Sequence, residues 1–344
     1  MPKLPEPRAQ RYIMIAGKRI KITPVFEAYW YFAAERQKIF FRRLRRLNGP
    51  HLTEDPILAS YRFTNSYRAS DRVSQYLISE VIYGPAASSD SDNLFFRILL
   101  FKLFNKIETW EAIEKAFGTI NLDSFDFELA GALLSKRQNS GMRNYSAAYI
   151  MPSCASMFDE QAKHMGHLKL LQWMLAQNYP ARLKDCRNME DAFALLRSVP
   201  SIGAFLAYQF VTDLNYSPLT NFSEMEFVMA GPGALDGISK CFDGLDDVTP
   251  ADVIKHMAEH QEQYLNEIVG TFDDLWGRPL QLIDCQNVFC EISKYSRVAY
   301  PAIGGLSGRT RIKQKYRLTG SISTPFYPPD WGLNQRISED IESS

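Results

Sequence analysis

The stretch from Arg62 to Leu77 carries polar side chains of the kinds that bind phosphates and nucleobases. Arg68 and Arg72 are four residues apart, so on a helix they share one face, where their guanidinium groups can hold phosphates. Asn65 has the donor and acceptor needed to read a base edge. A second interpretation stays open, in which these residues form a buried polar network that clamps two helices, with Asp71 pairing Arg68 or Arg72.

A second group of polar residues recurs with helical spacing. Asp284, Asn287, Glu291 and Lys294 are separated by 3, 4 and 3 positions, which places them along one face of a helix. The stripe is too polar for an ordinary core face, so we predict that it lines a pocket for a base. In the alternative interpretation, Glu291 and Lys294 pair with each other on the surface.

Two segments concentrate positive charge. Residues 36–46 include six basic side chains and no acid, and residues 309–317 include five and no acid. Such a run is often the solvated face of an amphipathic helix, and that alternative stays open for the first segment. The second lies in a loop-rich region with no helix face to solvate. We therefore predict that Arg309, Arg311 and Lys313 contact DNA phosphates.

Composition limits the class of protein. The chain has 344 residues and is 46% hydrophobic, which excludes a mostly disordered protein. Its 39 basic and 39 acidic residues give zero net charge, which excludes a globally basic nucleic-acid coat protein. No apolar run reaches the roughly 18 residues of a membrane-spanning helix. The first residues show no signal-peptide core, and the five cysteines form no CxxC, so we expect a cytoplasmic protein.

Motifs for metals and nucleotides are absent from the sequence. The histidine pairs 164/167 and 256/260 have helical spacing but no carboxylate or cysteine at ligand spacing. Neither HExxH nor GxxxxGK[ST] occurs, so we expect no metal, no cofactor and no P-loop kinase.

Hydrophobic periodicity predicts a mostly helical protein. Thr23 can cap a first helix that has Pro24 at its first position, and residues 11–22 alone predict a β-hairpin. Further helices are expected at 69–82, 93–104, 108–117, 126–136, 160–177, 188–198, 203–214, 250–269 and 284–298. We predict an N-terminal hairpin and basic helical region (1–92), a helical core (93–302) and a basic, loop-rich tail (303–344). They are expected to form one compact unit, with residues 86–92 as the best internal linker.

Residues 196–210 predict two helices joined by a tight turn, Val199-Pro-Ser-Ile-Gly203. The stretch resembles the helix-hairpin-helix of DNA glycosylases, which implies a glycosylase-like helical fold. In that motif glycine lets the backbone approach DNA, and free amides at the start of the second helix face a phosphate. Ser201 stands at the position of the first glycine of the family motif, and Gly203 corresponds to the second glycine. The alternative is an ordinary connection between helices.

This resemblance implies a catalytic acid about twenty residues beyond Gly203. Glu224 and Glu226 lie in that window, and Asp236 follows close to Gly231-Pro-Gly233, which either approaches a ligand or forms a plain turn. Such an acid would stabilise an oxocarbenium-like sugar or orient water. Phe205 occupies the place of the lysine used by bifunctional glycosylases, so water would be the nucleophile.

Three longer motifs resemble a narrower family. They are 62–77 (RFTNSYRASDRVSQYL), 230–238 (AGPGALDGI) and 284–295 (DCQNVFCEISKY). Together they resemble the alpha-glutamyl/putrescinyl thymine pyrophosphorylases, relatives of the helical domain of hydroxymethyluracil DNA kinases. The resemblance extends from about Phe26 to Trp331 and includes bacterial anti-phage glycosylases of modified cytosine. It implies double-stranded phage DNA with modified pyrimidines as the partner.

Three functions follow from this resemblance. The first expectation is a monofunctional DNA glycosylase that flips a hypermodified pyrimidine, such as glucosylated hydroxymethylcytosine, and leaves an abasic site in anti-phage defence; Tyr67, Tyr145, Tyr149 and Phe227 would stack on the base. The alternative is a transferase that replaces pyrophosphate on hydroxymethyluracil in DNA with an amine, with Arg68, Arg72 and Lys294 neutralising the leaving group. The third is a module that only binds modified DNA.

Overall fold

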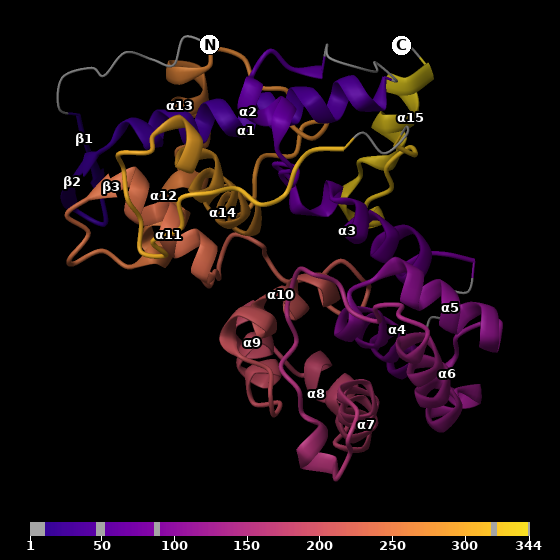
Figure 1. Ribbon diagram of the computed structural model, residues 1–344. Coiled ribbons are helices and arrows are strands. Elements are labelled where there is room, and N and C mark those ends of the chain that lie inside the picture. The colour runs from indigo at the N-terminus through magenta and orange to yellow at the C-terminus, as the bar shows by residue number, and fades with distance from the viewer. Residues whose placement is uncertain (1–10, 46–51, 86–89, 318–321, 343–344) are drawn as a thin grey trace. The chain divides into compact units, whose positions relative to one another are not determined.

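The computed structural model describes residues 11–45, 52–85, 90–317 and 322–342. Within these ranges the chain contains fifteen α-helices and three short strands, which confirms the prediction of a mostly helical protein (Figure 1). The helices are α1 Pro24–Leu44, α2 Pro56–Ser60, α3 Arg72–Tyr76, α4 Ser91–Phe104, α5 Ile107–Phe117, α6 Phe127–Asn139, α7 Lys163–Ala176, α8 Tyr179–Lys184, α9 Met189–Arg197, α10 Ala204–Leu214, α11 Pro232–Cys241, α12 Pro250–Glu259, α13 Gln261–Ile268, α14 Leu282–Ala299 and α15 Asn334–Glu342. The strands are β1 Tyr12–Ile15, β2 Lys18–Ile22 and β3 Phe242–Asp243.

The described residues gather into two compact units. Unit 1 combines those of 1–71, 224–325 and 331–344, and unit 2 combines those of 72–223 and 326–330. The predicted division of the chain near residues 92 and 302 stays a prediction. Residues 86–89 of the predicted linker, and Arg46 of the first basic segment, lie outside the described residues.

The core of unit 1 is built on α1. Thr23 caps this helix and Pro24 takes its first position, as predicted. Phe26 and Trp30 have no exposed surface, and both rings pack on Tyr264 of α13, with centroid distances of 5.0 and 5.6 Å. These aromatic contacts fix α1 against the helices that follow it.

A small antiparallel sheet precedes α1. The predicted hairpin is present, with β1 paired to β2 so that Ile13 lies opposite Ile20. Ala16 and Gly17 both have positive φ, which suits the tight turn. The two-residue strand β3 adds to β2, with Phe242 opposite Ile22, and its alternating pattern is too short to detect in the sequence.

Helices α11 and α14 pack very closely because of two glycines. A Cβ at Gly237 would lie 2.0 Å from the carbonyl oxygen of Phe289, and one at Gly233 would lie 3.1 Å from Sγ of Cys290. Phe289 also packs on Tyr29 of α1, at 4.6 Å between ring centroids. The glycine-rich stretch 231–237 therefore serves helix packing, which sets the position of α14.

Unit 2 is organised around α4, whose residues 93–104 are all buried. The Arg97 guanidinium has no exposed surface and donates hydrogen bonds to the carbonyl oxygens of Val81 and Ile120. Lys102 forms a buried ion pair of 2.9 Å with Asp213 of α10. A buried charge needs such partners, because desolvation without them costs several kcal/mol, of the order of 3–5.

The turn between α9 and α10 lies where the sequence places it. Ser201 has a φ of 66°, the left-handed conformation that glycine adopts most easily. Gly203 precedes α10 and is exposed, and a Cβ there would meet no atom within 4 Å. Because the first amides of a helix lack intrahelical partners, this end of α10 presents N–H groups next to open space.

The predicted helix at 69–82 is not continuous: it begins only at Arg72, and its second half is a π-helix. Residues Arg68–Ser70 form a 3-10 turn, Asp71 is extended, α3 begins at Arg72, and Leu77–Ile82 form a π-helix. The break arises because the Asp71 carboxylate accepts a hydrogen bond from the Asn65 N–H, which stabilises a turn instead of a helix. Arg68 and Arg72 therefore do not share a helix face.

Helices α2, α8, α11 and α15 lie outside the stretches predicted to be helical. In α15, within the predicted loop-rich tail, Ile337 is 1% exposed and anchors an otherwise polar helix. None of the helices in the described ranges combines the length and the apolar character that a membrane crossing requires.

Candidate functional site

Four charged residues of unit 1 form what we call the carboxylate–arginine cluster: Arg68, Glu224, Arg278 and Asp284. Asp284 is 4% exposed and lies in the first turn of α14. Its Oδ2 accepts a hydrogen bond from the N–H of Gln281 (3.0 Å), and its Oδ1 accepts one from the N–H of Arg68 (2.7 Å). Burial raises the pKa of Asp284 to about 6, against the lowering effect of these N–H groups and the two arginines.

Glu224 is the second acid of the cluster. Its Oε1 lies 2.7 Å from the Arg278 guanidinium, which in turn stacks over the Trp331 ring at 3.6 Å from its centroid. Burial raises the pKa of Glu224 to about 7; Arg278 lowers it, and the nearby charge of Asp284 raises it. A carboxyl that is partly protonated near neutral pH can both accept and donate a proton during catalysis.

The loop before α3 extends this polar region. Asp71 Oδ1 accepts from the N–H of Asn65 at 2.8 Å, and burial raises the pKa of Asp71 to about 7. The Asn65 amide donates to Ser70 O (2.7 Å) and accepts from Arg36 Nη2 (2.7 Å). Both ends of the Asn65 side chain are thus engaged inside the protein, as in the polar-network interpretation, and reading a base would require them to be released.

The stripe on α14 lies on one helix face, as its spacing predicts, and packs against this loop. Asn287 Nδ2 donates to Thr64 Oγ1 (3.1 Å) and to the carbonyl oxygen of Asn65 (3.0 Å). Glu291 accepts from the N–H of Thr64 (3.3 Å) and forms an ion pair with Lys294 at 2.6 Å. Lys294 has 30% of its side chain exposed, so it can still reach a ligand.

Tyr67 is 1% exposed and supports the cluster from within. Its hydroxyl donates to the carbonyl oxygen of Arg278 (2.7 Å) and accepts from the N–H of Leu275 (3.2 Å). A ring enclosed in this way offers no face to a base, so we assign Tyr67 to positioning Arg278.

The raised pKa of Glu224 predicts a pH-dependent difference in stability between the native chain and Glu224→Gln. Below the unfolded pKa of about 4.5, the Glu224 carboxyl is neutral in both the folded and the unfolded state. Between pH 4.5 and about 7 it ionises in the unfolded chain but stays largely neutral in the folded one, so the folded state loses stability over this range. The native chain should therefore lose about 2 kcal/mol of unfolding free energy relative to Glu224→Gln between pH 5 and 7.5.

Urea denaturation of both proteins at the two pH values measures this change, and taking the difference cancels the titration of the histidines. A difference that is constant with pH would show that Glu224 titrates normally.

The other predicted acids lie elsewhere in unit 1. Asp236 on α11 accepts hydrogen bonds from the Ser293 hydroxyl and the Ser307 N–H, so its oxygens are occupied. Glu226 is exposed and Phe227 is half-buried. Glu224 is therefore the only one of the three predicted acids that lies in the carboxylate–arginine cluster.

Several predicted site residues belong to unit 2. The Tyr145 hydroxyl shares a hydrogen bond with Nδ1 of His167 (2.7 Å). Tyr149 stacks on Phe205 of α10, with ring centroids 5.8 Å apart. Arg72 is exposed at the start of α3. The stacking of Tyr149 on Phe205 joins the loop before α7 to the turn that holds Ser201 and Gly203.

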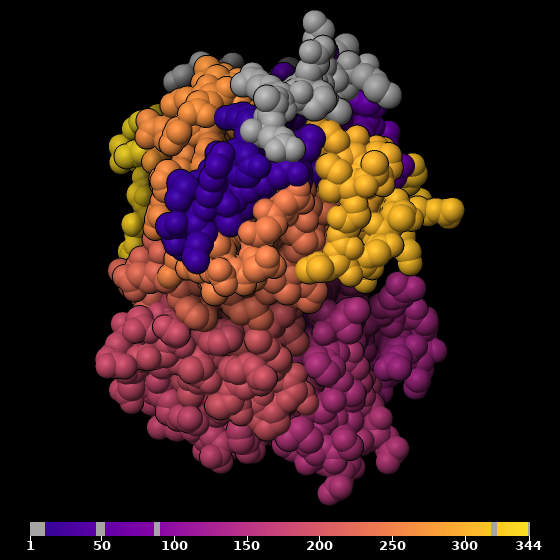
Figure 2. Space-filling model, turned by 90° about the vertical axis from the view of Figure 1, so that its left-hand side faces the viewer, coloured from indigo at the N-terminus to yellow at the C-terminus, as the bar shows by residue number. Residues whose placement is uncertain are grey.

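The second basic segment lies on the surface of unit 1, as the gold region of Figure 2 shows. It runs antiparallel to residues 60–62: the N–H of Arg62 donates to Gln314 O (3.0 Å), and the N–H of Tyr316 donates to Ser60 O (3.0 Å). Within the described residues, Arg309, Arg311 and Lys313 form no ion pair and are exposed. The segment therefore carries positive charge that is available to phosphates and adjoins the loop beginning at Thr64.

Comparison with known proteins gives a family for this fold. The family model for the 5-hmdU DNA kinase helical domain matches residues 23–305. The chain belongs to this family. It is also 25% identical over 288 residues to a protein named 5-hmdU DNA kinase from Bacillus phage SP10. The match covers 79% of this chain and 45% of the phage protein, so the chain spans less than half the length of that relative. No solved structure matches the chain.

Membership of this family corrects the first functional expectation. The family and the phage relative are both named for a DNA kinase, which transfers a group and does not hydrolyse an N-glycosidic bond. The prediction of a monofunctional DNA glycosylase, a hydrolase, was therefore wrong. It relied on a short hairpin motif and on the resemblance to a family that includes anti-phage glycosylases, and likenesses at the level of fold do not determine the chemistry at the base.

Two functional candidates of the site were missed in the sequence. Arg278 lies in a loop between α13 and α14, and Trp331 comes from a segment more than fifty residues later. Neither has a periodic neighbour that would draw attention to it. Arg36 was noted only as part of a charge run.

Among the described residues, no group of three or more His, Cys, Asp and Glu side chains could hold a metal ion.

Proposed function

We propose that this chain is a transferase acting on the 5-hydroxymethyl group of hydroxymethyluracil in DNA. The family and the name of the phage relative support this substrate class. The observation that carries the proposal is the carboxylate–arginine cluster, in which Glu224 has a pKa raised to about 7 beside Arg278. This combination provides a proton acceptor and a fixed positive charge for a phosphorylated group.

The reaction that we favour is displacement of pyrophosphate by an amine. The amine nitrogen forms a bond to the methylene carbon at position 5, and the bond from that carbon to the pyrophosphate oxygen breaks. Pyrophosphate leaves with the electron pair, and the Glu224 carboxylate takes the proton that the amine releases. Arg68, Arg278 and Lys294 offset the charge of the leaving group.

Phosphoryl transfer to the 5-hydroxymethyl oxygen is the second candidate, because the phage relative is named a kinase. In that reaction the hydroxyl oxygen attacks the terminal phosphorus of a nucleoside triphosphate, the bond from that phosphorus to the bridging oxygen breaks, and the nucleoside diphosphate leaves with the electron pair. Glu224 takes the proton of the hydroxyl. The absence of GxxxxGK[ST] from the 344 residues leads us to place displacement first.

DNA would be held by two further elements under this proposal. Arg309, Arg311 and Lys313 would contact phosphates on unit 1. On unit 2, the turn with Ser201 and Gly203 would present the first amides of α10 to a phosphate, in the manner of a helix-hairpin-helix. Tyr145, Tyr149 and Arg72 remain candidates for contacts on the same unit.

Product analysis tests the proposed function. The chain is incubated with duplex DNA that carries either 5-hydroxymethyluracil and ATP, or its pyrophosphate ester and an amine such as putrescine or glutamate. The DNA is then digested to nucleosides for mass spectrometry. An amine-bearing nucleoside supports displacement, and a phosphorylated one supports phosphoryl transfer. Salt-sensitive binding without any product would leave only a binding module and overturn the proposal.

A further inference from the structure

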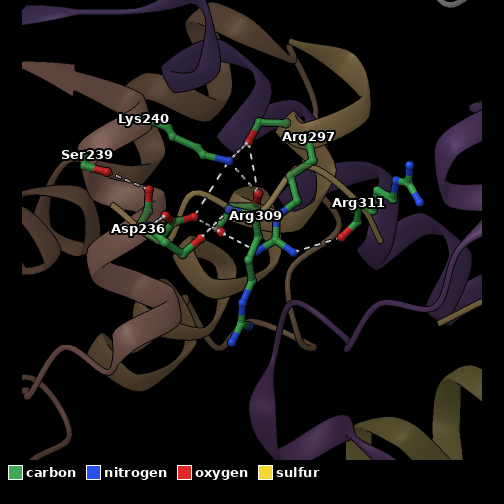
Figure 3. Close-up of polar contacts among 9 residues, drawn as sticks. Asp236, Ser239, Lys240, Arg297, Arg309 and Arg311 are labelled. Carbon is green, nitrogen blue, oxygen red and sulfur yellow. Dashed lines mark hydrogen bonds and ion pairs between the residues drawn. The ribbon is translucent and has the colours of Figure 1, made fainter. Parts of the chain in front are cut away.

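A buried carboxylate outside the proposed reaction centre is surrounded by donors. Asp236 is 1% exposed and accepts hydrogen bonds from the Ser293 hydroxyl of α14 and, at 2.6 Å, from the N–H of Ser307 (Figure 3). Lys240, one turn later on α11, lies 3.7 Å from it and donates to the carbonyl oxygen of Ser293 at 3.0 Å. Burial raises the pKa of Asp236, but these donors outweigh it and lower the pKa overall, so the carboxylate stays ionised.

The loop after α14 lies directly on this carboxylate. A Cβ at Gly305 would come within 2.6 Å of Asp236 Oδ1 and 2.5 Å of Lys240 Cε, whereas one at Gly304 would meet nothing within 4 Å. Glycine at position 305 is therefore needed for this close approach, and Ser307 completes it through its N–H. Asp236 thus fixes the loop at a defined point before the basic segment begins.

The basic segment is held at both ends. Its far end pairs with residues 60–62 through Gln314 and Tyr316. Between the two anchors, Arg297 Nη1 donates to the carbonyl oxygen of Arg311 (3.2 Å), and the side chains of Arg309 and Arg311 point away from Asp236 (Figure 3). Burial lowers the pKa of Arg297; the charges of Asp236 and Glu291 raise it, and that of Arg309 lowers it. Asp236 thus has Lys240 and Arg297 beside it, and the exposed side chains of Arg309, Arg311 and Lys313 add positive charge that favours an anion.

We propose that Asp236 is a positioning residue: held by Ser293 and Lys240, it fixes the loop at Gly305 and Ser307 and thereby keeps Arg309, Arg311 and Lys313 in place for DNA phosphates. The role in DNA binding rests on the proposed function, whereas the fixing of the loop does not. Asp236 is accordingly assigned to the binding of the DNA backbone and not to the chemistry at the base.

The test compares Gly305→Ala and Asp236→Asn with the native chain and with Gly304→Ala as the matched control. The rate of trypsin cleavage after the lysines and arginines within residues 309–317, followed by mass spectrometry, measures how firmly the segment is held. Affinity for a duplex containing 5-hydroxymethyluracil, measured at several salt concentrations, reports how many phosphates the protein binds. Circular dichroism checks that each variant is folded.

We expect cleavage about tenfold faster in Gly305→Ala and Asp236→Asn than in the native chain and Gly304→Ala, because local opening exposes the segment. The negative slope of log affinity against log salt should become shallower by about one to three units. Each phosphate that the variant no longer binds reduces the magnitude of the slope by roughly 0.9. Native-like cleavage in folded Gly305→Ala would overturn the fixing of the loop. Faster cleavage with an unchanged salt slope would overturn the role in DNA binding, and either result leaves the transferase proposal to its own test.

Discussion

Replacing Glu224 with glutamine is expected to lower the rate of group transfer by about 100-fold or more, the usual contribution of a positioned general base. The amide keeps the size of the side chain but cannot take the proton released by the nucleophile. The ratio of the native rate to the Glu224→Gln rate should rise with pH through about 7, where the carboxyl ionises, and then level off. Taking this ratio cancels the ionisation of the amine itself, which affects both proteins alike.

Single-turnover rates measured from pH 5.5 to 8.5 on saturating DNA check this prediction. Glu262→Gln is the control, because Glu262 is an exposed glutamate of the same unit, and it should stay within about twofold of the native rate. The rate of Glu226→Gln, measured in the same way, tests whether the second predicted acid contributes to the reaction. A full loss of activity in Glu226→Gln, with Glu224→Gln unaffected, would move the catalytic role to the exposed residue.

Replacing Gly237 with alanine is expected to lower the unfolding free energy by about 3 kcal/mol or more. Alanine is the better helix former by about 1 kcal/mol, which alone would stabilise α11. The added methyl group, however, would lie 2.0 Å from a backbone carbonyl oxygen of α14, where no flexible side chain can yield. The steric term should therefore decide the sign.

Urea denaturation of three alanine variants measures this effect. Gly233→Ala, whose Cβ would lie 3.1 Å from the Cys290 side chain, should cost less than Gly237→Ala because a side chain can adjust. Gly304→Ala meets no atom within 4 Å and should be close to neutral. Equal stability of Gly237→Ala and Gly304→Ala would show that α11 and α14 can separate freely.

The sequence predicts the helices well where a long hydrophobic pattern determines them. The helices α4, α5, α7, α10 and α14 begin and end within three residues of the expected bounds. Prediction fails at residues 68–71, where the Asp71 carboxylate accepts a hydrogen bond from the Asn65 N–H and the chain forms a turn before the helix begins. It also fails for the short helices α2 and α8, which have too few turns to show a pattern.

The candidate site was predictable in part. The spacing of Asp284, Asn287, Glu291 and Lys294 indicated one helix face, and the structure places that face against the loop after Thr64. The partner of Glu224 was not predictable, because Arg278 reaches it through a tertiary contact 54 residues away in the chain. Glu226 and Glu224 are indistinguishable by spacing; burial alone separates them.

The fate of the oxygen at the 5-hydroxymethyl position distinguishes displacement of pyrophosphate from excision of the base. DNA is prepared with ¹⁸O in the bond between the methylene carbon and pyrophosphate, and incubated with an amine and either the native chain or Glu224→Gln. We expect ¹⁸O in released pyrophosphate, an amine-bearing nucleoside that has lost the label, and little product with Glu224→Gln. Release of the labelled base with an abasic site left in the DNA would contradict the proposed displacement.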